Sequence, residues 1–342
     1  MRIELPISKS IANRWLILQA IHGDELMPVS DSMPDDVQIL HLALTTLHNT
    51  TQSNTTLHLS NCGTAMRFLT AYAAQLENRV TILDGVERMH HRPIGQLVDA
   101  LREIGADIEY LGKEGFPPLR IKGCILDKHR IVTINHPQST QFVSALLLIG
   151  ANVHTNSTSP YITLTRELIQ YCTTLHNSTQ RYTIEKDWSS AAFWYEYVAL
   201  YGGEIILPGL YRDSLQGDKV VADIFAHLGV STQYTEEGIR IYRSQAILNS
   251  KFLIQNFSAC PDLYPAVALT CERLGIGLHA TGTDSLPLKE SDRLRAVREH
   301  RTDADHRMAM ALLVAGYEVD DTACISKSYP QFLEHFRQLR KK

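Results

Sequence analysis

The sequence predicts an α/β protein built from several copies of one small strand–helix unit. One pattern recurs along the chain: an apolar-periodic segment, a glycine, and then a short β-rich segment. It occurs at residues 97–111, 193–207, 221–234, 267–282 and 311–321. Each glycine stands where the C-terminus of a helix needs a left-handed residue, and the alternation after it is typical of a strand. Further strands are predicted at 79–85, 129–136 and 159–165. Repeated units of this size indicate the α/β class, or α+β in some schemes.

The first element, at residues 6–21, is predicted to be a helix that Ser8 can cap. Four of its polar residues project from one side, because they lie one helical turn apart: Lys9, Ser10, Asn13 and Arg14. Two interpretations stay open. The helix is amphipathic with a solvated face, or its two cations and a hydroxyl hold an anion near a helix N-terminus.

Composition excludes several classes of protein. The chain has 342 residues, of which 44% are hydrophobic and 20% charged, with a net charge of −4. These values are typical of a globular protein, and they provide no surplus of cations for a nucleic acid or an anionic membrane. No apolar run approaches the roughly 20 residues that span a bilayer. Lys9, Asn13 and Arg14 interrupt what could be mistaken for a signal peptide. We therefore expect a cytoplasmic protein with neither nucleic-acid nor membrane partners.

The six cysteines are scattered and include no C-x-x-C pair: Cys62, Cys124, Cys172, Cys260, Cys271 and Cys324. This spacing favours reduced thiols over a disulfide framework or a metal site. A domain boundary is predicted within 207–218, where Pro208, Gly209 and Gly217 punctuate the chain. It divides the chain into a lobe that ends near residue 210 and a second lobe after it.

Three polar clusters in the first half of the chain precede apolar helices. They contain Asn61, Gly63 and Thr64; then Arg92; then Ser139, Thr140 and Gln141. A glycine-containing turn at a helix start exposes backbone N–H groups to an anion, and Pro93 stiffens the loop that presents Arg92. The simpler interpretations are a turn, a surface arginine and a helix cap. Ser159 and Tyr161 flank Pro160, which is also consistent with an ordinary strand entry.

Clusters in the second half add charged groups. Asp262 lies between two prolines at the start of a helix, either as an N-cap or as a base or clamp for a hydroxyl. Glu290 and Arg293 have the spacing of an exposed helix pair. His306 and Arg307 lie together at a helix start, as in an anion site. The remaining residues of these clusters are Lys289, Asp305 and Lys327. Lys327 lies on a predicted loop, and its simpler interpretation is a solvated lysine.

Taken in order, these motifs resemble one family. The succession PISKSIANR, NCGTAMR, HRPIGQLVDAL, STQF, SPYI, PDLYPA, LKESDRL, DHRMAMA and SKSYPQF closely resembles 5-enolpyruvylshikimate-3-phosphate synthase (3-phosphoshikimate 1-carboxyvinyltransferase). The resemblance runs from about residue 3 to residue 335. It implies an inside-out α/β barrel of two lobes, each built from three βαβαββ units, with a substrate cleft that closes on binding. The lobes would comprise 7–210, and 211–342 with 1–6.

The resemblance implies which residues bind the two substrates. Those for shikimate 3-phosphate are Lys9, Ser10, Arg14, Ser139, Thr140, Thr158, Tyr161, Asp262 and Lys289, with Thr158 in place of the family's serine. Those for phosphoenolpyruvate are Lys9, Asn61, Gly63, Arg92, Gln141, Arg293, Arg307 and Lys327. Such a cage of arginines and lysines suits a small molecule that carries a phosphate and a carboxylate.

The implied reaction is enolpyruvyl transfer by addition and elimination. The 5-hydroxyl attacks C2 of phosphoenolpyruvate while C3 is protonated, and loss of phosphate then regenerates the enol ether. Asp262 is the candidate base and Glu290 the candidate acid. Lys9 can shuttle protons and His306 can assist at the phosphate end. No metal or organic cofactor is implied, the family is monomeric, and Gly63 leaves room for the inhibitor glyphosate.

Three features depart from the family pattern. The chain begins only a few residues before Lys9, where the family has a strand that crosses to the C-terminal lobe. Phe68 stands where many members have proline, which is expected to alter the response to glyphosate. Only LRAVREHRTDA separates Arg293 from Asp305, so part of one repeat is missing. We expect this to leave a sheet edge uncovered or to make the loop that carries Glu290 and Arg293 less rigid.

Two alternatives to the predicted activity are considered. The related transferase that acts on UDP-N-acetylglucosamine would have a Lys-Asn pair near its start and a cysteine before Arg92, and this chain has neither. A shortened homologue that binds phosphorylated ligands with little or no turnover is favoured by the missing segment, whereas the retained residues argue against it.

Overall fold

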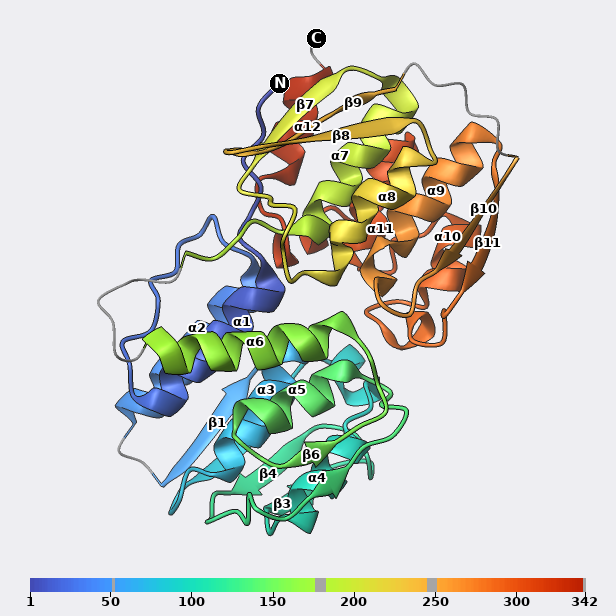
Figure 1. Ribbon diagram of the computed structural model, residues 1–342. Helices are drawn as coiled ribbons and strands as arrows, with labels where there is room; N and C mark the ends of the chain where they lie inside the picture. The colour runs from blue at the N-terminus through green and yellow to red at the C-terminus, as the bar shows by residue number, and fades with distance from the viewer. Residues whose placement is uncertain (51–52, 176–182, 245–250, 341–342) are drawn as a thin grey trace. The chain divides into compact units, whose positions relative to one another are not determined.

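Contacts divide the chain into two compact units (Figure 1). The computed structural model describes residues 1–50, 53–175, 183–244 and 251–340. Unit 1 contains Met1–Lys9, Asp31–Asp35 and Thr183–Lys342, and unit 2 contains Ser10–Ser30 and Asp36–Tyr182. The division therefore falls before residue 183 and not near 210, because α7 (Trp188–Tyr201) and β7 (Glu204–Pro208) pack with the rest of unit 1.

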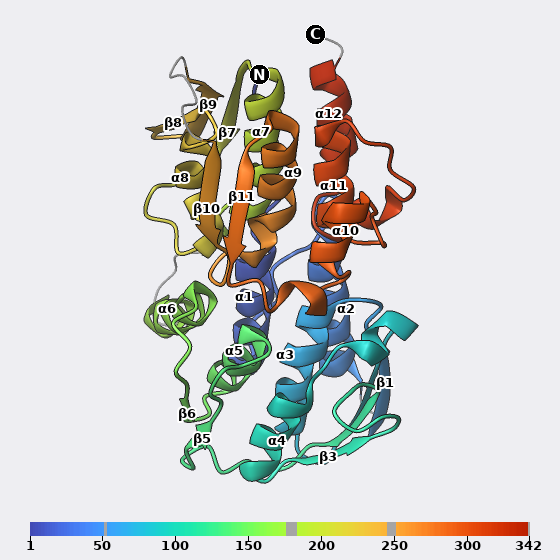
Figure 2. The ribbon, with the colours of Figure 1, turned by 90° about the vertical axis from the view of Figure 1, so that its right-hand side faces the viewer.

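Unit 2 contains one complete βαβαββ repeat. Its elements are β1 (Asn54–His58), α3 (Gly63–Ala74), β2 (Val80–Asp84), α4 (Gly95–Glu103), β3 (Asp107–Tyr110) and β4 (Leu119–Lys122), with a short 3-10 helix, η1 (Glu87–His91), before α4. The strand order is β1-β2-β4-β3, with β1 and β2 parallel and the other neighbours antiparallel. Helices α3 and α4 pack against this sheet (Figure 2). The predicted strand at 79–85 is β2.

The other elements of unit 2 include four helices and a short parallel pair of strands. They are α1 (Lys9–His22), α2 (Asp35–Asn49), α5 (Thr140–Leu148), α6 (Pro160–Leu175), β5 (Val132–Thr133) and β6 (Val153–His154). The strand predicted at 159–165 is wrong, since this stretch begins α6. Pro160 suits the first position of a helix, and the Ser159 hydroxyl accepts a hydrogen bond from the Tyr161 N–H at 3.4 Å.

Unit 1 contains an antiparallel sheet, and the start of the chain forms an isolated bridge to it. The elements that follow β7 include α8 (Val221–Ala226), β8 (Val230–Thr235) and β9 (Gly238–Arg243), and the sheet order is β7-β9-β8. Arg2 forms a parallel bridge with Ile206 of β7, and the Ile3 N–H donates to the Ile206 carbonyl at 2.9 Å. The residues before Lys9 therefore lie along the outer edge of β7.

The repeat expected to be shortened is incomplete in the structure. Strands β10 (Phe252–Asn256) and β11 (Gly277–Thr281) pair in parallel around α9 (Tyr264–Leu274), and no third strand joins them among the residues that the structure describes. Phe252 and Ile254 on β10 are 70% and 74% exposed. Helix α10 (Arg293–Glu299) leads to α11 (His306–Ala315) through only a few residues (Figure 2).

The strand predicted after α11, within 311–321, is also wrong. Residues 317–319 have no regular structure, because the Tyr317 ring stacks on His300 at 4.0 Å and its hydroxyl donates to Glu272. These side-chain contacts hold Tyr317 against Glu272 of α9 and against His300 at the end of α10. The segment is therefore fixed by side chains and not by pairing with a strand.

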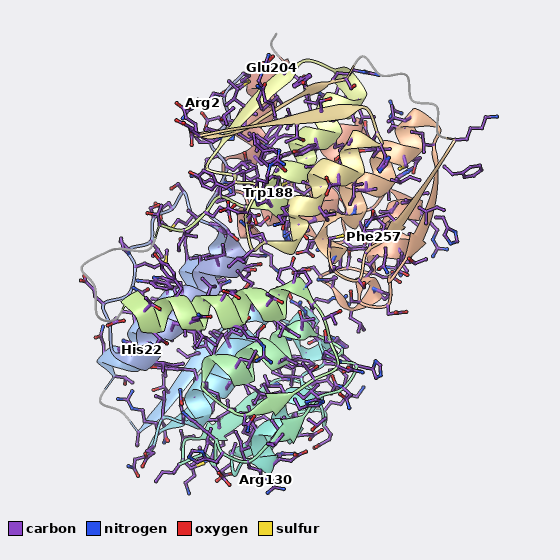
Figure 3. All side chains as sticks on the ribbon, viewed as in Figure 1. Arg2, His22, Arg130, Trp188, Glu204 and Phe257 are labelled. Carbon is purple, nitrogen blue, oxygen red and sulfur yellow. The ribbon has the colours of Figure 1, made fainter. Side chains whose placement is uncertain are left out.

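The core of unit 1 is formed by α7, α9 and α11, which pack against one another. Helix α7 is apolar on most of its circumference, and Trp188, Phe193 and Trp194 are at most 1% exposed. Figure 3 labels Trp188, the first residue of α7, and Phe257, which follows β10. Phe332 of α12 (Phe332–Arg340) packs against Phe193 edge to face and against Trp194 at a tilt. Burial of each such side chain contributes about 1.5–3 kcal/mol. No described helix has the length and apolar character to cross a membrane.

Candidate active site

Asp262 is the centre of a buried ionic cluster in unit 1. Its Oδ1 accepts hydrogen bonds from Lys289 Nζ at 3.2 Å and from Arg293 Nη1 at 2.8 Å. Its Oδ2 lies 3.0 Å from Arg307 Nη2. The short 3-10 helix Pro261–Leu263 places the carboxylate there, just before α9. The simple N-cap interpretation of Asp262 is therefore wrong, since no cap hydrogen bond joins it to α9 and three cations surround it.

Arg293 joins this carboxylate to two others. It donates through Nε to Asp305 at 2.8 Å and through Nη2 to Glu290 at 3.3 Å. Glu290 also accepts from Lys327 Nζ at 2.9 Å. Arg293 is only 1% exposed and the Asp305 side chain is fully buried, so the interpretation of Glu290 and Arg293 as an exposed helix pair is wrong.

The cluster shifts the pKa values of its members. Burial works to raise the pKa of Asp262, but Arg307, Lys289 and Arg293 outweigh it and hold that pKa well below its usual range. Burial would lower the pKa of Arg293, and the three carboxylates raise it instead. At neutral pH Asp262 is ionised and Arg293 is charged.

The N-terminus of α11 presents buried nitrogen atoms. Asp305 caps this helix by accepting from the Arg307 N–H at 2.9 Å. Arg307 Nη1 and both ring nitrogens of His306 are buried, and none has a hydrogen-bond partner among the described residues. Burial first, and then the charges of Lys9 and Arg307, lower the pKa of His306 well below its usual value. A neutral imidazole and an arginine with an unused donor therefore stand at a helix N-terminus, where an anion is favoured.

Two further buried acids stand near this cluster and were missed in the sequence. Asp187 caps α7 by accepting from the Ser190 N–H at 3.2 Å, and it also accepts from the Ser190 hydroxyl at 2.6 Å. Ser189 donates to Asp218. Burial raises the pKa of both acids, that of Asp218 to about 7, while Arg307 opposes the shift in each. Asp187 directly precedes an apolar helix, a pattern from which an N-cap can be predicted. No pattern in the neighbouring sequence predicts that Asp218 is buried.

In unit 2, Gly63 lies beside two guanidinium groups. Arg92 Nη1 donates to the Asn61 carbonyl at 3.3 Å, and Arg67 Nη1 donates to the Gly63 carbonyl at 2.9 Å. A Cβ atom built on Gly63 would come within 2.3 Å of Arg67 and 2.5 Å of Arg92. The absence of a side chain at Gly63 therefore provides the space for both arginines. Arg67 was quoted within a motif in the sequence, but no role was assigned to it.

Arg14 is a buried part of the same unit. It is 3% exposed and donates to the Thr165 hydroxyl at 2.7 Å, to the Ser10 carbonyl at 2.8 Å and to the Ser144 hydroxyl at 3.0 Å. Its guanidinium also lies over the Phe68 ring, 5.4 Å from the centroid. Burial lowers the pKa of Arg14 to about 10. Arg14 therefore braces α1, α5 and α6, and Asn13 is fully buried, so the solvated-face interpretation of this helix is wrong.

Polar residues at the starts of α5 and α6 cap these helices. The Ser139 hydroxyl caps α5 by accepting from the Gln141 N–H, and Gln141 Nε2 donates to the Thr64 hydroxyl at 2.8 Å. Gln141 is thereby joined to the first turn of α3, which begins at Gly63. Ser159 caps α6, whereas the neighbouring Thr158 is exposed.

The structure thus gathers the predicted site residues into two groups, one in each unit. Unit 1 holds Lys9, Asp262, Lys289, Glu290, Arg293, His306, Arg307 and Lys327. Unit 2 holds Ser10, Arg14, Asn61, Gly63, Arg92, Ser139, Thr140, Gln141, Thr158 and Tyr161. The six cysteines are unbridged, and the described residues include no cluster of three or more potential metal ligands.

Comparison with known proteins identifies the family. The family described as EPSP synthase (3-phosphoshikimate 1-carboxyvinyltransferase) matches residues 35–173, 150–300 and 297–336. The chain belongs to the EPSP synthase family. A 3-phosphoshikimate 1-carboxyvinyltransferase from Bacteroides fragilis is 36% identical over 396 residues, which cover 98% of this chain and 94% of that protein. One from Cellvibrio japonicus is 31% identical over 417 residues, 98% of this chain and 96% of that protein.

Solved structures of EPSP synthase share the fold. The structure from Acinetobacter baumannii superposes with a TM-score of 0.69 at 17% identity, over 99% of this chain and 95% of that one. The α/β class predicted from the sequence is confirmed. Both relatives align over more positions than the 342 of this chain, so they contain residues that it lacks, as expected for a shortened EPSP synthase family member.

Proposed function

We propose that the chain is an enolpyruvyl transferase of aromatic amino acid biosynthesis. It transfers the enolpyruvyl group of phosphoenolpyruvate to the 5-hydroxyl of shikimate 3-phosphate and releases phosphate. Membership of the EPSP synthase family and relatives of that name over nearly the whole chain support this proposal. The proposed enzyme acts on these small molecules without a metal or organic cofactor, as a cytoplasmic monomer. Sedimentation analysis would test the oligomeric state.

The observation that carries the proposal is the set of buried nitrogen atoms at the start of α11. Arg307 Nη1 and the ring nitrogens of His306 have no partner among the described residues. An unused guanidinium donor in a buried place is costly unless a ligand satisfies it. A carboxylate or phosphate is the ligand that this donor set recognises, and phosphoenolpyruvate carries both.

In the proposed reaction, the shikimate 5-oxygen forms a bond to C2 of phosphoenolpyruvate as C3 gains a proton. The C2–O bond to phosphate then breaks and C3 returns the proton, so the enol ether forms again. Glu290, between Arg293 and Lys327, is proposed as the acid at C3. Lys9, Arg92, Arg307 and Lys327 are proposed to offset the charge of the phosphate that leaves.

Asp262 is proposed as the base toward the 5-hydroxyl. Three cations hold its pKa well below its usual range when no substrate is bound, which makes it a weak base in that state. When an anionic substrate pairs with Lys289 or Arg307, these cations stabilise the ionised form of Asp262 less. The pKa of Asp262 then rises, and the carboxylate becomes a stronger base. The remaining predicted contacts, including those of Ser10, Arg14, Thr158 and Tyr161 with shikimate 3-phosphate, stay part of the proposal.

Phosphate release with both substrates tests the proposed function. We expect turnover in the unmodified chain and a loss of at least about a hundredfold in Asp262→Ala and in Glu290→Gln. Asp284→Ala, which removes an exposed carboxylate five residues before Lys289, is the control and should retain full activity. Well-folded unmodified protein without turnover would contradict the proposal and favour the homologue that only binds phosphorylated ligands.

Gly63→Ala should weaken the binding of phosphoenolpyruvate while the protein stays folded. The added Cβ meets the ends of two flexible side chains, so the guanidiniums of Arg67 and Arg92 swing away at little cost in stability. We expect the KM for phosphoenolpyruvate to rise about tenfold, as for the loss of one charged contact of roughly 1.4 kcal/mol. Steady-state kinetics with each substrate varied would measure it. An unchanged KM for phosphoenolpyruvate would remove Arg92 from the proposed site.

A further inference from the structure

The short link between α10 and α11, residues 300–304, is held in an unusual conformation. His300, Asp303 and Ala304 have φ values of 51°, 46° and 56°. Residues other than glycine seldom adopt this left-handed region, and they remain there only where the surroundings enforce it. The surroundings of the link therefore constrain its backbone.

Side chains fix the link at three points. Asp303 accepts from Arg295 Nη2 and from Arg301 Nε, each at 3.1 Å. The buried Thr302 donates to Asp320. His300 Nε2 lies 2.8 Å from Glu272 Oε1 on α9. Asp303 differs from the other two points because its carboxylate binds both Arg295 of α10 and Arg301 of the link. It therefore joins the helix to the link.

The link has a direct consequence for the ionic cluster. It is followed directly by Asp305, which caps α11 and accepts from Arg293, the first residue of α10. Helix α10, the link and the Arg293–Asp305 pair therefore form a closed ring. Any loosening of the link changes the placement of Arg293 on one side of the ring and of Arg307 on the other.

We propose that Asp303 is a positioning residue: by holding the shortened link rigid, it fixes the guanidiniums of Arg293 and Arg307 for phosphoenolpyruvate. This inference rests on the proposed function of these two arginines. The short link would then keep the two arginines preorganised in this chain.

Two variants of the link and one matched control test the inference. Asp303→Asn keeps the size and the left-handed preference of residue 303 but removes both ion pairs. A Gly-Ser insertion after Thr302 loosens the link without removing a side chain. Glu299→Gln is the control, since the Glu299 carboxylate also pairs with Arg295, at 3.8 Å, and this pair lies within α10.

Kinetics and amide exchange are the readouts. We expect the KM for phosphoenolpyruvate to rise about three- to tenfold in Asp303→Asn and at least about tenfold with the insertion. The KM for shikimate 3-phosphate should change less, and Glu299→Gln should match the unmodified chain. Hydrogen exchange of the Arg307 and Ala309 amides, which Asp305 holds, should be faster in the two link variants only.

The outcomes separate the inference from the proposed function. Exchange rates and KM values that are equal in all variants would overturn the inference, even if each variant loses thermal stability. An unmodified chain without turnover would contradict the proposed function, and faster exchange in the two link variants would still support a rigid link that Asp303 maintains.

Discussion

Arg293→Met is expected to abolish turnover and to lower the free energy of unfolding by about 3–5 kcal/mol. Arg293 is the common partner of Asp262, Glu290 and Asp305, and it is only 1% exposed. Its removal leaves Asp305 fully buried and without its strongest counter-charge. An uncompensated buried carboxylate is more costly than the loss of the pair itself.

Urea denaturation and phosphate release measure the two effects of Arg293→Met. Arg298→Met is the control, because Arg298 lies on the same helix with an exposed side chain, and it should change neither quantity by much. The double variant Arg293→Met/Asp305→Asn should regain part of the lost stability but no activity. If Arg293→Met alone is as stable as the unmodified chain, the buried cluster does not have the energetic role assigned to it.

Glu196→Met is expected to stabilise the protein by about 2 kcal/mol or more at pH 7. Glu196 lies in α7, fully buried in the core of unit 1, and neither of its carboxyl oxygens has a hydrogen-bond partner among the described residues. Burial raises the pKa of this carboxyl well above its usual value. Methionine has a similar length and no polar group to desolvate.

The effect of Glu196 on stability should depend on pH in a definite direction. Below the unfolded pKa of about 4.3, both states are protonated and the carboxyl carries no ionisation penalty. As the pH rises toward the raised folded pKa, only the unfolded state ionises, so the folded state loses up to about 1.4 kcal/mol per pH unit. Glu196→Met should therefore show a flatter stability profile between pH 5 and 8.

Thermal or urea unfolding at several pH values measures this profile. Glu196→Gln should flatten it as well, because the amide does not ionise, but should stabilise less than methionine, because its polar group stays buried. Glu318→Gln, at an exposed position after α11, should leave the profile unchanged. Parallel pH profiles for Glu196→Met and the unmodified chain would show that Glu196 finds a partner or water when it ionises.

Residues close in sequence allowed most helices and strands to be predicted. The helix–glycine–strand cadence correctly placed α4 with β3, α7 with β7, α8 with β8, and α9 with β11. The cadence failed after α11, and the separate strand prediction at 159–165 failed as well. In both places the same apolar pattern fits a strand or a helix, and a local cap or a distant aromatic contact decides. Elements depend on short-range periodicity, whereas these exceptions depend on what packs beside them.

The sequence by itself determined the class of the fold, the family and the order of the motifs that contain the candidate site, because all three are written in residue types and spacing. Only the tertiary structure decided that Arg293 is buried among three carboxylates, that Arg67 joins Arg92 beside Gly63, and that the shortened link is braced by Asp303. Burial and ion pairing join residues far apart in the chain, or turn a common local pair into a buried one. Local sequence patterns do not show which residues will be buried or paired in this way.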